Sequence, residues 1–204
     1  MTKIDSLILG PYATNCYLLW KDRHVLIVDP ASKSNKIHQL ITMFDGIVDG
    51  IYLTHGHFDH IAGVDVMVEH YHCPVYMNEL DIPLLTNPYL NVSAGSGLGN
   101  VVVDSEVKAL APNENTIGAF SFTLVDAPGH SEGSCLMLWE NHMICGDVIF
   151  KGSIGRTDLV GGSNIKMMQS LQMIRSLDPD YIIYPGHGEQ TTLLEELKTN
   201  PYLM

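Results

Sequence analysis

The sequence predicts one α/β domain over residues 1–204, a four-layered αββα sandwich of two mixed β-sheets with helices on their outer faces. Runs of strands followed by helices occur twice along the chain, with no linker and no internal repeat between them. The 204 residues are 46% hydrophobic and 17% charged, which suits a folded enzyme and is too apolar for a disordered chain. A chain of this length buries around 70% of its unfolded surface, enough for a large core.

Apolar runs bounded by turn residues predict the strands of the first half. These strands lie at 3–9, 15–20, 25–29 and 48–53. Between the last two strands, Ser32 can cap a helix that runs to about Phe44, because apolar residues recur there at helical spacing. A second helix is expected to begin at Phe58, since Ile61 and Val64 continue with the same spacing.

The second half follows a long irregular stretch at 87–100. Its central glycines are typical of a mobile surface loop or an active-site lid, because no Lys-Ser or Lys-Thr pair follows to make a phosphate loop. Around this stretch, strands are expected at 75–77, 101–103, 121–125, 134–139, 143–145 and 181–184, and helices at 79–85, 165–177 and 192–198.

Composition limits the partners of the chain. The formal charge is −12, from 23 acidic and 11 basic residues, and no basic run occurs, so nucleic acid and polyanionic substrates are not expected. No apolar run of about 18 residues and no signal-like N-terminus occurs, so we expect a cytoplasmic protein with no membrane partner.

The cysteines form no C-x-x-C pair and are expected to be reduced core thiols. They are Cys16, Cys73, Cys135 and Cys145.

The stretch from Thr54 to His60 gathers three imidazoles and one carboxylate directly after an apolar strand end. Such side chains are ligands for zinc, iron or manganese, and burying them unpaired would be costly. In an extended segment residues i and i+2 face the same way, so His55 and His57 can close on one ion. Asp59 and His60 fall in the first turn of the next helix and can face a second ion. The motif therefore predicts two metal sites.

Three later strand ends each add one candidate ligand. His130, Asp147 and His187 each follow a glycine that comes shortly after an apolar run. Glycine lets the backbone approach an ion closely at a strand tip. One such turn alone is commonly just a turn, but three of them combined with the first motif indicate a metal centre. The remaining histidines match no motif and are interpreted as surface or structural residues: His24, His38, His70, His72 and His142.

The stretch 54–60 with His130, Asp147 and His187, in this order, resembles the metallo-β-lactamase-fold hydrolase superfamily. Three segments are further similar to the short bacterial relatives of glyoxalase II, the hydroxyacylglutathione hydrolases. These segments are 146–150, 155–158 and 184–188. The resemblance covers nearly the whole chain and implies the αββα fold.

The resemblance also implies a role for each residue. Three histidines hold the first metal, two histidines and an aspartate hold the second, and another aspartate bridges both. In that order, the ligands are His55, His57 and His130; Asp59, His60 and His187; and Asp147. The implied cofactors are two divalent metal ions, zinc in the first place, with iron or manganese as alternatives. Asp59, which can orient the attacking water, and Asp147 are the expected catalytic residues.

The leading hypothesis is hydrolysis of a small thioester, such as S-lactoylglutathione or a related acyl-thiol. Water held between two cations loses a proton near neutral pH and becomes a nucleophile. A thiol with a pKa of about 8.5 leaves without strong acid help, and no obvious general acid stands beside the ligands, so a thioester fits better than an amide. The expected partner is therefore a small-molecule thioester. The oligomeric state is not predicted.

Alternative functions remain open. A persulfide dioxygenase of the same superfamily would use a single iron held by His55, His130 and Asp147, because two histidines and one carboxylate are typical of iron(II) oxygenases. A metallohydrolase acting on another ester or amide is a further alternative. A non-catalytic module with this fold is disfavoured, because a decayed site has no physical reason to keep buried carboxylates and imidazoles together.

Three features bear on the choice of substrate. Arg156 either holds a substrate carboxylate or pairs with Asp158 to fix its own loop. Full-length glyoxalase II enzymes have a further helical C-terminal segment that contacts glutathione, whereas this sequence ends at Met204. We therefore do not expect the thiol part of the substrate to be glutathione in particular. True metallo-β-lactamases commonly have a cysteine ligand in place of Asp147. Cys145 would point to the opposite side of its strand end, so antibiotic hydrolysis is not expected.

Overall fold

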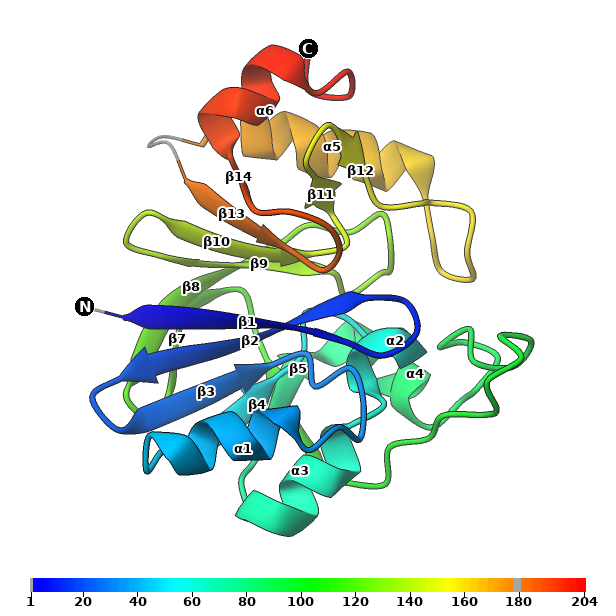
Figure 1. The fold of residues 1–204 in the computed structure, drawn as a ribbon. Coiled ribbons are helices and arrows are strands. Elements are labelled where there is room, and N and C mark those ends of the chain that lie inside the picture. The colour runs from blue at the N-terminus through cyan, green and yellow to red at the C-terminus, as the bar shows by residue number, and fades with distance from the viewer. Residues whose placement is uncertain (1, 178–180) are drawn as a thin grey trace.

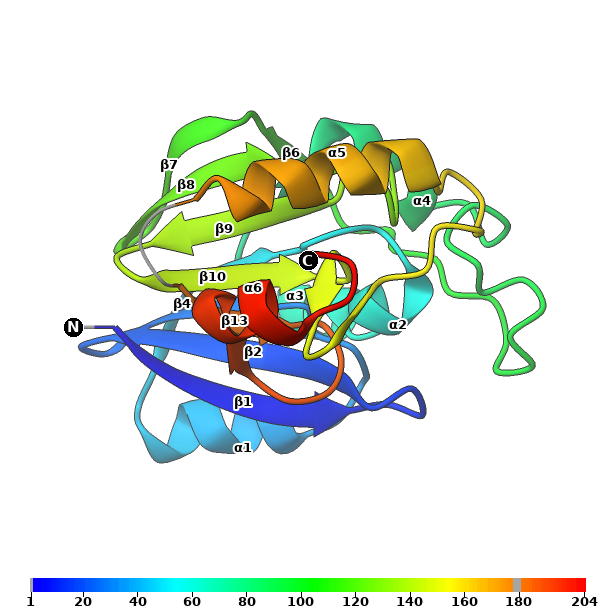
Figure 2. The same cartoon turned by 90° about the horizontal axis from the view of Figure 1, so that it is seen from above.

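The computed structural model describes residues 2–177 and 181–204, so Met1 and residues 178–180 lie outside the described part. It confirms the four-layered sandwich of two mixed six-stranded sheets with flanking helices (Figure 1). Helices α1 (Lys36–Met43) and α3 (Val64–Tyr71) lie outside the first sheet. Helices α5 (Asn164–Arg175) and α6 (Leu193–Thr199) lie outside the second sheet (Figure 2).

The first sheet contains six strands in sequence order. They are β1 (Lys3–Leu9), β2 (Thr14–Lys21), β3 (His24–Val28), β4 (Ile47–Tyr52), β5 (Val75–Asn78) and β6 (Val107–Leu110). The first three strands pair antiparallel, and β3 to β6 pair parallel. Parallel strands bring their C-terminal ends to one edge of the sheet, and the stretch 54–60 leaves β4 at that edge.

The second sheet has the strand order β14-β13-β10-β9-β8-β7. Its strands are β7 (Asn113–Ile117), β8 (Phe120–Asp126), β9 (Cys135–Trp139), β10 (His142–Gly146), β13 (Ile182–Pro185) and β14 (Thr191–Thr192). Among its described residues, β10 and β13 pair parallel and the other neighbouring strands pair antiparallel. A short hairpin of β11 (Ile149–Phe150) and β12 (Ser153–Ile154) follows Asp147. The segments after β8, β10 and β13 therefore carry His130, Asp147 and His187.

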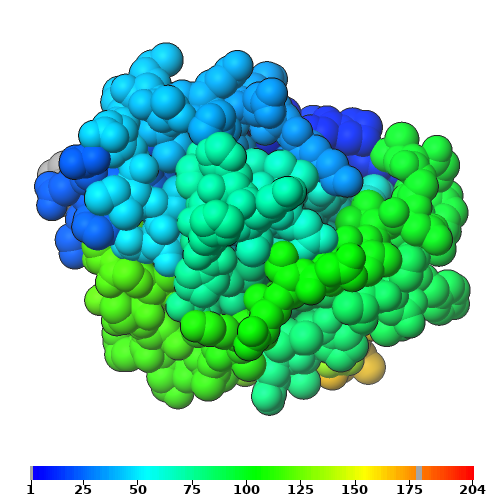
Figure 3. Space-filling view, turned by 90° about the horizontal axis from the view of Figure 1, so that it is seen from below, coloured from blue at the N-terminus to red at the C-terminus, as the bar shows by residue number. Residues whose placement is uncertain are grey.

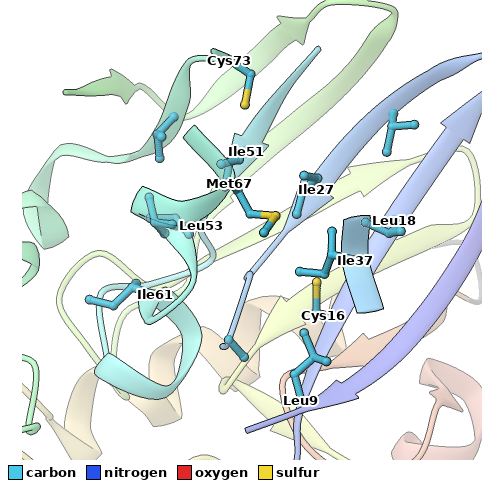
Figure 4. Packing of buried hydrophobic residues seen from close by; sticks show 14 of the residues in the cluster. Leu9, Cys16, Leu18, Ile27, Ile37, Ile51, Leu53, Ile61, Met67 and Cys73 are labelled. Carbon is cyan, nitrogen blue, oxygen red and sulfur yellow. The ribbon is translucent and has the colours of Figure 1, made fainter. Parts of the chain in front are cut away.

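Strand alternation divides the apolar side chains between layers. Leu18 packs in the cluster under α1 and α3, together with Ile37 (Figure 4), whereas its neighbour Leu19 packs between the two sheets with Phe122. A third cluster, which includes Leu171, lies under α5 and α6. Fully burying one such side chain stabilises the fold by about 1.5–3 kcal/mol. Neighbouring residues of one strand thus hold different layers together, which fixes the register.

The outer face of the first sheet also anchors the chain that follows the irregular stretch 87–100. Figure 3 shows α1 and α3 in blue and cyan on this face, with green atoms of the segment near residue 100 beside them. The side chain of Asp65 in α3 accepts hydrogen bonds from the backbone N–H groups of Asp104 (3.1 Å) and Ser105 (3.0 Å).

Among the described residues, no helix is both long enough and apolar enough to cross a bilayer.

The prediction of a strand at 101–103 is wrong. Val101 donates its backbone N–H to Ser93 Oγ (3.0 Å) and Val103 donates to the Leu85 carbonyl (2.9 Å), so these groups serve the loop instead of a ladder. The first sheet ends with β6, and the second begins with β7, a strand that the sequence did not predict. Most of β7 is polar and exposed, so hydrophobic alternation does not reveal it.

Two expected helices also differ from the structure. The first begins after Asn35, which makes no side-chain cap, so Ser32 is not its cap. The helix expected from Phe58 consists of α2 (Phe58–Ile61) and then α3, with a break at Gly63. Gly63 donates its N–H to the Pro30 carbonyl (2.7 Å), and a Cβ there would lie 2.3 Å from the Ser32 carbonyl oxygen. This close backbone contact explains the break.

The other predicted helices and strands agree with the structure within a few residues. The helix expected at 79–85 is the 3₁₀ turn η1 (Glu79–Asp81) followed by α4 (Ile82–Leu85). The stretch 87–100 contains only turns and bends, as expected. It extends from the edge of the sandwich at which α2 and α4 lie (Figure 2). The long connection is therefore positioned beside the stretch 54–60.

Candidate metal centre

The structure brings all seven predicted ligand residues together at one edge of the sandwich. Potential ligand atoms within each of three groups lie within 4.8 Å of one another. The groups are His55, His57 and His130; Asp59, His60 and His187; and His55, His60 and Asp147. The first two groups coincide with the two ligand sets that the resemblance implied, and the third contains Asp147 together with one histidine of each set.

Asp147 lies between the two sites through its two carboxylate oxygens. Its Oδ1 is 3.4 Å from His60 Nε2, and its Oδ2 is 3.5 Å from both His130 Nε2 and His187 Nε2. Gly186 makes room for this carboxylate, because a Cβ on Gly186 would lie 2.1 Å from Asp147 Oδ1. The glycine before His187 therefore permits the close approach that the sequence predicted.

Several buried polar atoms in this cluster have no hydrogen-bond partner among the described residues. They include His55 Nε2, His60 Nε2 and Asp147 Oδ1. Leaving such atoms unsatisfied is costly, whereas imidazole nitrogen and carboxylate oxygen are ordinary ligands of divalent cations. The donor set therefore fits metal ions.

Outer hydrogen bonds fix which ring nitrogens face inward. His60 Nδ1 donates to Asp29 Oδ2 (2.8 Å), and His55 Nδ1 lies 3.1 Å from Thr54 Oγ1, which itself donates to Asp29 Oδ2 (2.7 Å). Asp29 Oδ1 also accepts the Thr54 backbone N–H (2.9 Å). One buried carboxylate thus directs the Nε2 atoms of both histidines toward the centre. Asp29 is not recognisable from the sequence, since a lone aspartate before a proline usually marks a turn.

The other ligand candidates are positioned in the same way. His130 Nδ1 donates to the Arg156 carbonyl (2.8 Å), and His187 Nδ1 donates to the Tyr12 carbonyl (3.1 Å). Asp59 Oδ2 accepts from Thr14 Oγ1 (3.2 Å) and lies 3.2 Å from His187 Nε2. Contacts to carbonyls and carboxylates fix the tautomer and ring orientation of ligating histidines.

Asp81 is a second buried carboxylate that no sequence pattern reveals. Its Oδ2 accepts the Gly56 N–H (2.9 Å) and the Ser131 hydroxyl (2.7 Å), and its Oδ1 accepts the Gly133 N–H (2.7 Å). Burial raises the pKa of Asp81 although these hydrogen bonds oppose the shift. Asp81 therefore ties the turn between His55 and His57 to the loop that carries His130.

Charge divides the cluster into two parts. Burial, and then the neighbouring imidazoles, holds the pKa of His55 well below its ordinary value, and burial with His130 lowers the pKa of His57 to about 3. Burial also opposes protonation of His60, but the carboxylates of Asp147 and Asp59 outweigh it and raise the pKa of His60. His55 and His57 therefore present neutral imidazoles. The carboxylates around His60 attract positive charge, which a divalent cation can supply.

A cavity of about 790 Å³ opens over the cluster. Its lining includes His57, His130 and His187, together with Tyr89 and Val92 from the long irregular segment. Of the two alternatives for this segment, a mobile surface loop and an active-site lid, its position agrees with a place at the site, because the segment forms one wall of the cavity.

The remaining side chains singled out from the sequence lie outside the ligand groups. Cys145 is buried and donates to the Ile149 carbonyl (3.2 Å), and it belongs to none of the three ligand groups. All four cysteines are free and buried, as expected. Arg156 forms a bidentate ion pair with Asp158, at 2.8 Å for each contact. Of the two roles expected for Arg156, this is the one in which it fixes its own loop. The five histidines without a motif lie outside the ligand groups.

Comparison with known sequences identifies the family. The profile of the Metallo-beta-lactamase superfamily matches residues 9–187. The "Probable metallo-hydrolase YqgX" of Bacillus subtilis is 36% identical, covering 96% of this chain and 94% of that protein. The "Hydroxyacylglutathione hydrolase GloC" of Haemophilus influenzae is 27% identical, covering 98% of this chain and 97% of that protein.

Solved structures agree with this result. The BLEG-1 B3 metallo-beta-lactamase superposes with a TM-score of 0.94 at 33% identity, covering 98% of this chain and 99% of that chain. TTHA1623 in a di-iron-bound form superposes with a TM-score of 0.88 at 34% identity, covering 98% of this chain and all of that chain. With its sandwich fold and its clusters of histidine and aspartate, this chain belongs to the metallo-beta-lactamase superfamily and has the candidate metal site of a metallo-hydrolase.

Proposed function

We propose that this protein is a dinuclear-metal-dependent hydrolase that cleaves a small acyl-thiol. The observation that carries the proposal is the position of Asp147, whose two oxygens face both ligand groups at the floor of the cavity. In this proposal His55, His57 and His130 hold one ion, Asp59, His60 and His187 hold the other, and Asp147 bridges them. Zinc is the first choice, and the similarity to a di-iron-bound relative supports iron as an alternative.

The protein's own groups prepare this site for hydrolysis. Two bound divalent ions would lower the pKa of a shared water to about 7 and polarise the acyl carbonyl. Asp59 lies at the cavity surface, where its carboxylate can orient a water molecule by accepting a hydrogen bond while Thr14 Oγ1 holds the carboxylate in place (3.2 Å). The apolar side chains around the cavity limit water, which strengthens these electrostatic contacts.

The leaving group supports a thioester over an amide. An amine must be protonated as it leaves, whereas a thiol with a pKa of about 8.5 departs as the thiolate. Among the described residues that line the cavity, each histidine belongs to a ligand group and the Arg156 guanidinium is paired with Asp158. Apart from the hydroxyls of Tyr12 and Tyr89, no ionisable side chain among the described lining residues is thus free to act as a general acid. The similarity to a hydroxyacylglutathione hydrolase also favours an acyl-thiol.

A β-lactam amide is a second candidate, because of the similarity to BLEG-1. The buried position of Cys145 disfavours it, since that thiol cannot serve as the second-site ligand common in β-lactamases. A persulfide dioxygenase with one iron at His55, His130 and Asp147 is a third. It would leave the group of Asp59, His60 and His187 without a role in the chemistry.

The protein as purified should therefore contain two metal ions per chain and release thiol from an acyl-thiol without consuming oxygen. Elemental analysis, thiol release and oxygen uptake are measured on one preparation, with a β-lactam assayed in parallel. One iron per chain with persulfide-dependent oxygen uptake would establish the dioxygenase instead. Efficient β-lactam turnover with negligible thioester cleavage would establish the amide hydrolase.

Replacing Asp29 with Asn should weaken metal binding by about 10–100-fold, as is typical of residues that orient metal ligands. The amide can donate to His60 Nδ1, which moves the imidazole proton to the Nε2 atom that faces the metal. The measurement is competition for metal against a chelator of known affinity. Asp49→Asn is the matched control, because Asp49 contacts His24 Nδ1 at a similar distance (2.7 Å) outside the ligand groups. Equal affinities for both variants would contradict the role of Asp29.

A further inference from the structure

Beyond the metal-facing residues, the wall of the cavity is mainly apolar. It is formed by Phe58, Val92, Phe150, Ile154, Leu159 and Val160. These side chains come from α2, the long irregular segment, the β11–β12 hairpin and the loop that follows it. A substrate arm that rests against this wall loses water without gaining polar partners, which favours an uncharged arm.

Val92 is held against this wall by an unusual backbone conformation. Its φ is 68°, in the left-handed region that a β-branched residue seldom adopts. The neighbouring Asn91 is fully buried, and its Nδ2 donates to the carbonyls of Leu84 (3.0 Å) and Val101 (2.9 Å). The Asn91 carbonyl accepts the N–H of Phe58 (3.0 Å), which ties this segment to the metal motif. Strain kept in place by surrounding contacts is typical of functional sites.

The cavity contains one lysine or arginine side chain among the described residues, and that side chain is already paired. Arg156 contacts both oxygens of Asp158 at 2.8 Å. Its carbonyl is fixed by His130 Nδ1 (2.8 Å), so the backbone of this loop is anchored. A substrate carboxylate must displace Asp158, which is tethered two residues away and therefore competes at a high effective concentration.

We propose that the acyl-thiol has an uncharged, apolar arm, and that the pairing of Arg156 with Asp158 disfavours thiols with free carboxylates, such as glutathione. This inference rests on the proposed hydrolase function and specifies its substrate class. The formal charge of −12 acts in the same direction, because it disfavours the approach of anions.

The test compares two thioesters with the same acyl group and the same tripeptide backbone: N-acetyl-S-lactoylglutathione, which is anionic, and its diethyl ester, in which both carboxylates are masked and no charge remains. Thiol release by the metal-loaded enzyme gives kcat/KM for each. The diester should be preferred by about threefold or more, because the Arg156–Asp158 pair is exposed to solvent and an exposed ion pair contributes less than a buried one. In Asp158→Asn the guanidinium is released, so kcat/KM for the anionic substrate should rise about threefold, with the diester unchanged.

Two further variants test whether the freed Arg156 guanidinium causes the gain in kcat/KM. Adding Arg156→Met to Asp158→Asn should remove the gain, because the freed guanidinium produces it. Asp45→Asn releases Arg23 from an exposed Arg–Asp ion pair, and neither of these two residues lines the cavity, so selectivity should stay at the wild-type value. A wild-type preference for the anionic substrate, or no gain in Asp158→Asn, would overturn the inference and leave the hydrolase function intact. If the metal-loaded enzyme released thiol from neither substrate, the proposed function would fail as well.

Discussion

Replacing Asp147 with Asn should reduce turnover by more than about 100-fold and lower the metal content from two ions per chain to one or none. Substitutions of residues that only orient ligands already cost about 10–100-fold, and Asp147 faces both ligand groups directly. An amide has nearly the same shape but supplies neither a negative charge nor a second acceptor oxygen. Two cations would then lie close together without the anion between them, which raises their mutual repulsion.

The measurement combines elemental analysis with kcat for thiol release. Asp126→Asn is a suitable control, because Asp126 also ends a strand and accepts a hydrogen bond, from Asn78 Nδ2 (2.9 Å), but belongs to no ligand group. The control should keep both metals and its turnover. A folded Asp147→Asn protein that bound two ions with wild-type affinity and kept its turnover would show that the bridging role is wrong.

The ligand residues could be predicted from sequence because each one belongs to a local pattern. Four of them lie in the stretch 54–60, and His130, Asp147 and His187 each stand next to a glycine at a strand tip. Local geometry of this kind is encoded in adjacent residues, so spacing reveals it. The orientation of Cys145 away from the site followed from strand alternation in the same way.

Asp29 and Asp81 could not be predicted, because their partners are distant in the sequence. Asp29 contacts His60, 31 residues away, and Asp81 contacts Gly133, 52 residues away. A single aspartate has no spacing pattern, and only the fold brings it to its partners. Arg156 illustrates a different limit, since the sequence left two roles open and the structure shows the ion pair with Asp158.

The fold errors also have a physical cause. The valines at 101–103 have high strand propensity, yet the loop uses their backbone groups, so tertiary contacts override propensity. The strand β7 is polar because it forms an edge of the second sheet, where solvent covers much of its surface. Buried strands such as β3 and β9 were predicted closely, because burial of whole strands leaves a continuous apolar run.

Removing the metal ions with a chelator should abolish thioester cleavage, and returning zinc, iron or manganese should restore it. The described residues of the cavity supply no cysteine nucleophile, because all four thiols are buried. Burial raises the pKa of Cys73 to about 11 and that of Cys135 to about 12, so neither forms a thiolate near neutral pH. The readouts are thiol release and thermal unfolding, measured on the same metal-free and reloaded samples.

Thermal unfolding gives a readout that does not depend on catalysis. Metal at about 1,000 times its dissociation constant adds about 4 kcal/mol to stability, which raises the unfolding midpoint of a chain of this size by about 8 °C or more. Alkylation of the native protein serves as the control and should leave activity unchanged, since the thiols are inaccessible. Persistent hydrolysis in a sample shown by elemental analysis to be metal-free would contradict a metal-dependent mechanism. In the proposed mechanism the unpartnered Nε2 atoms of His55 and His60 gain their missing partners only from the cations, so stability and activity should return together.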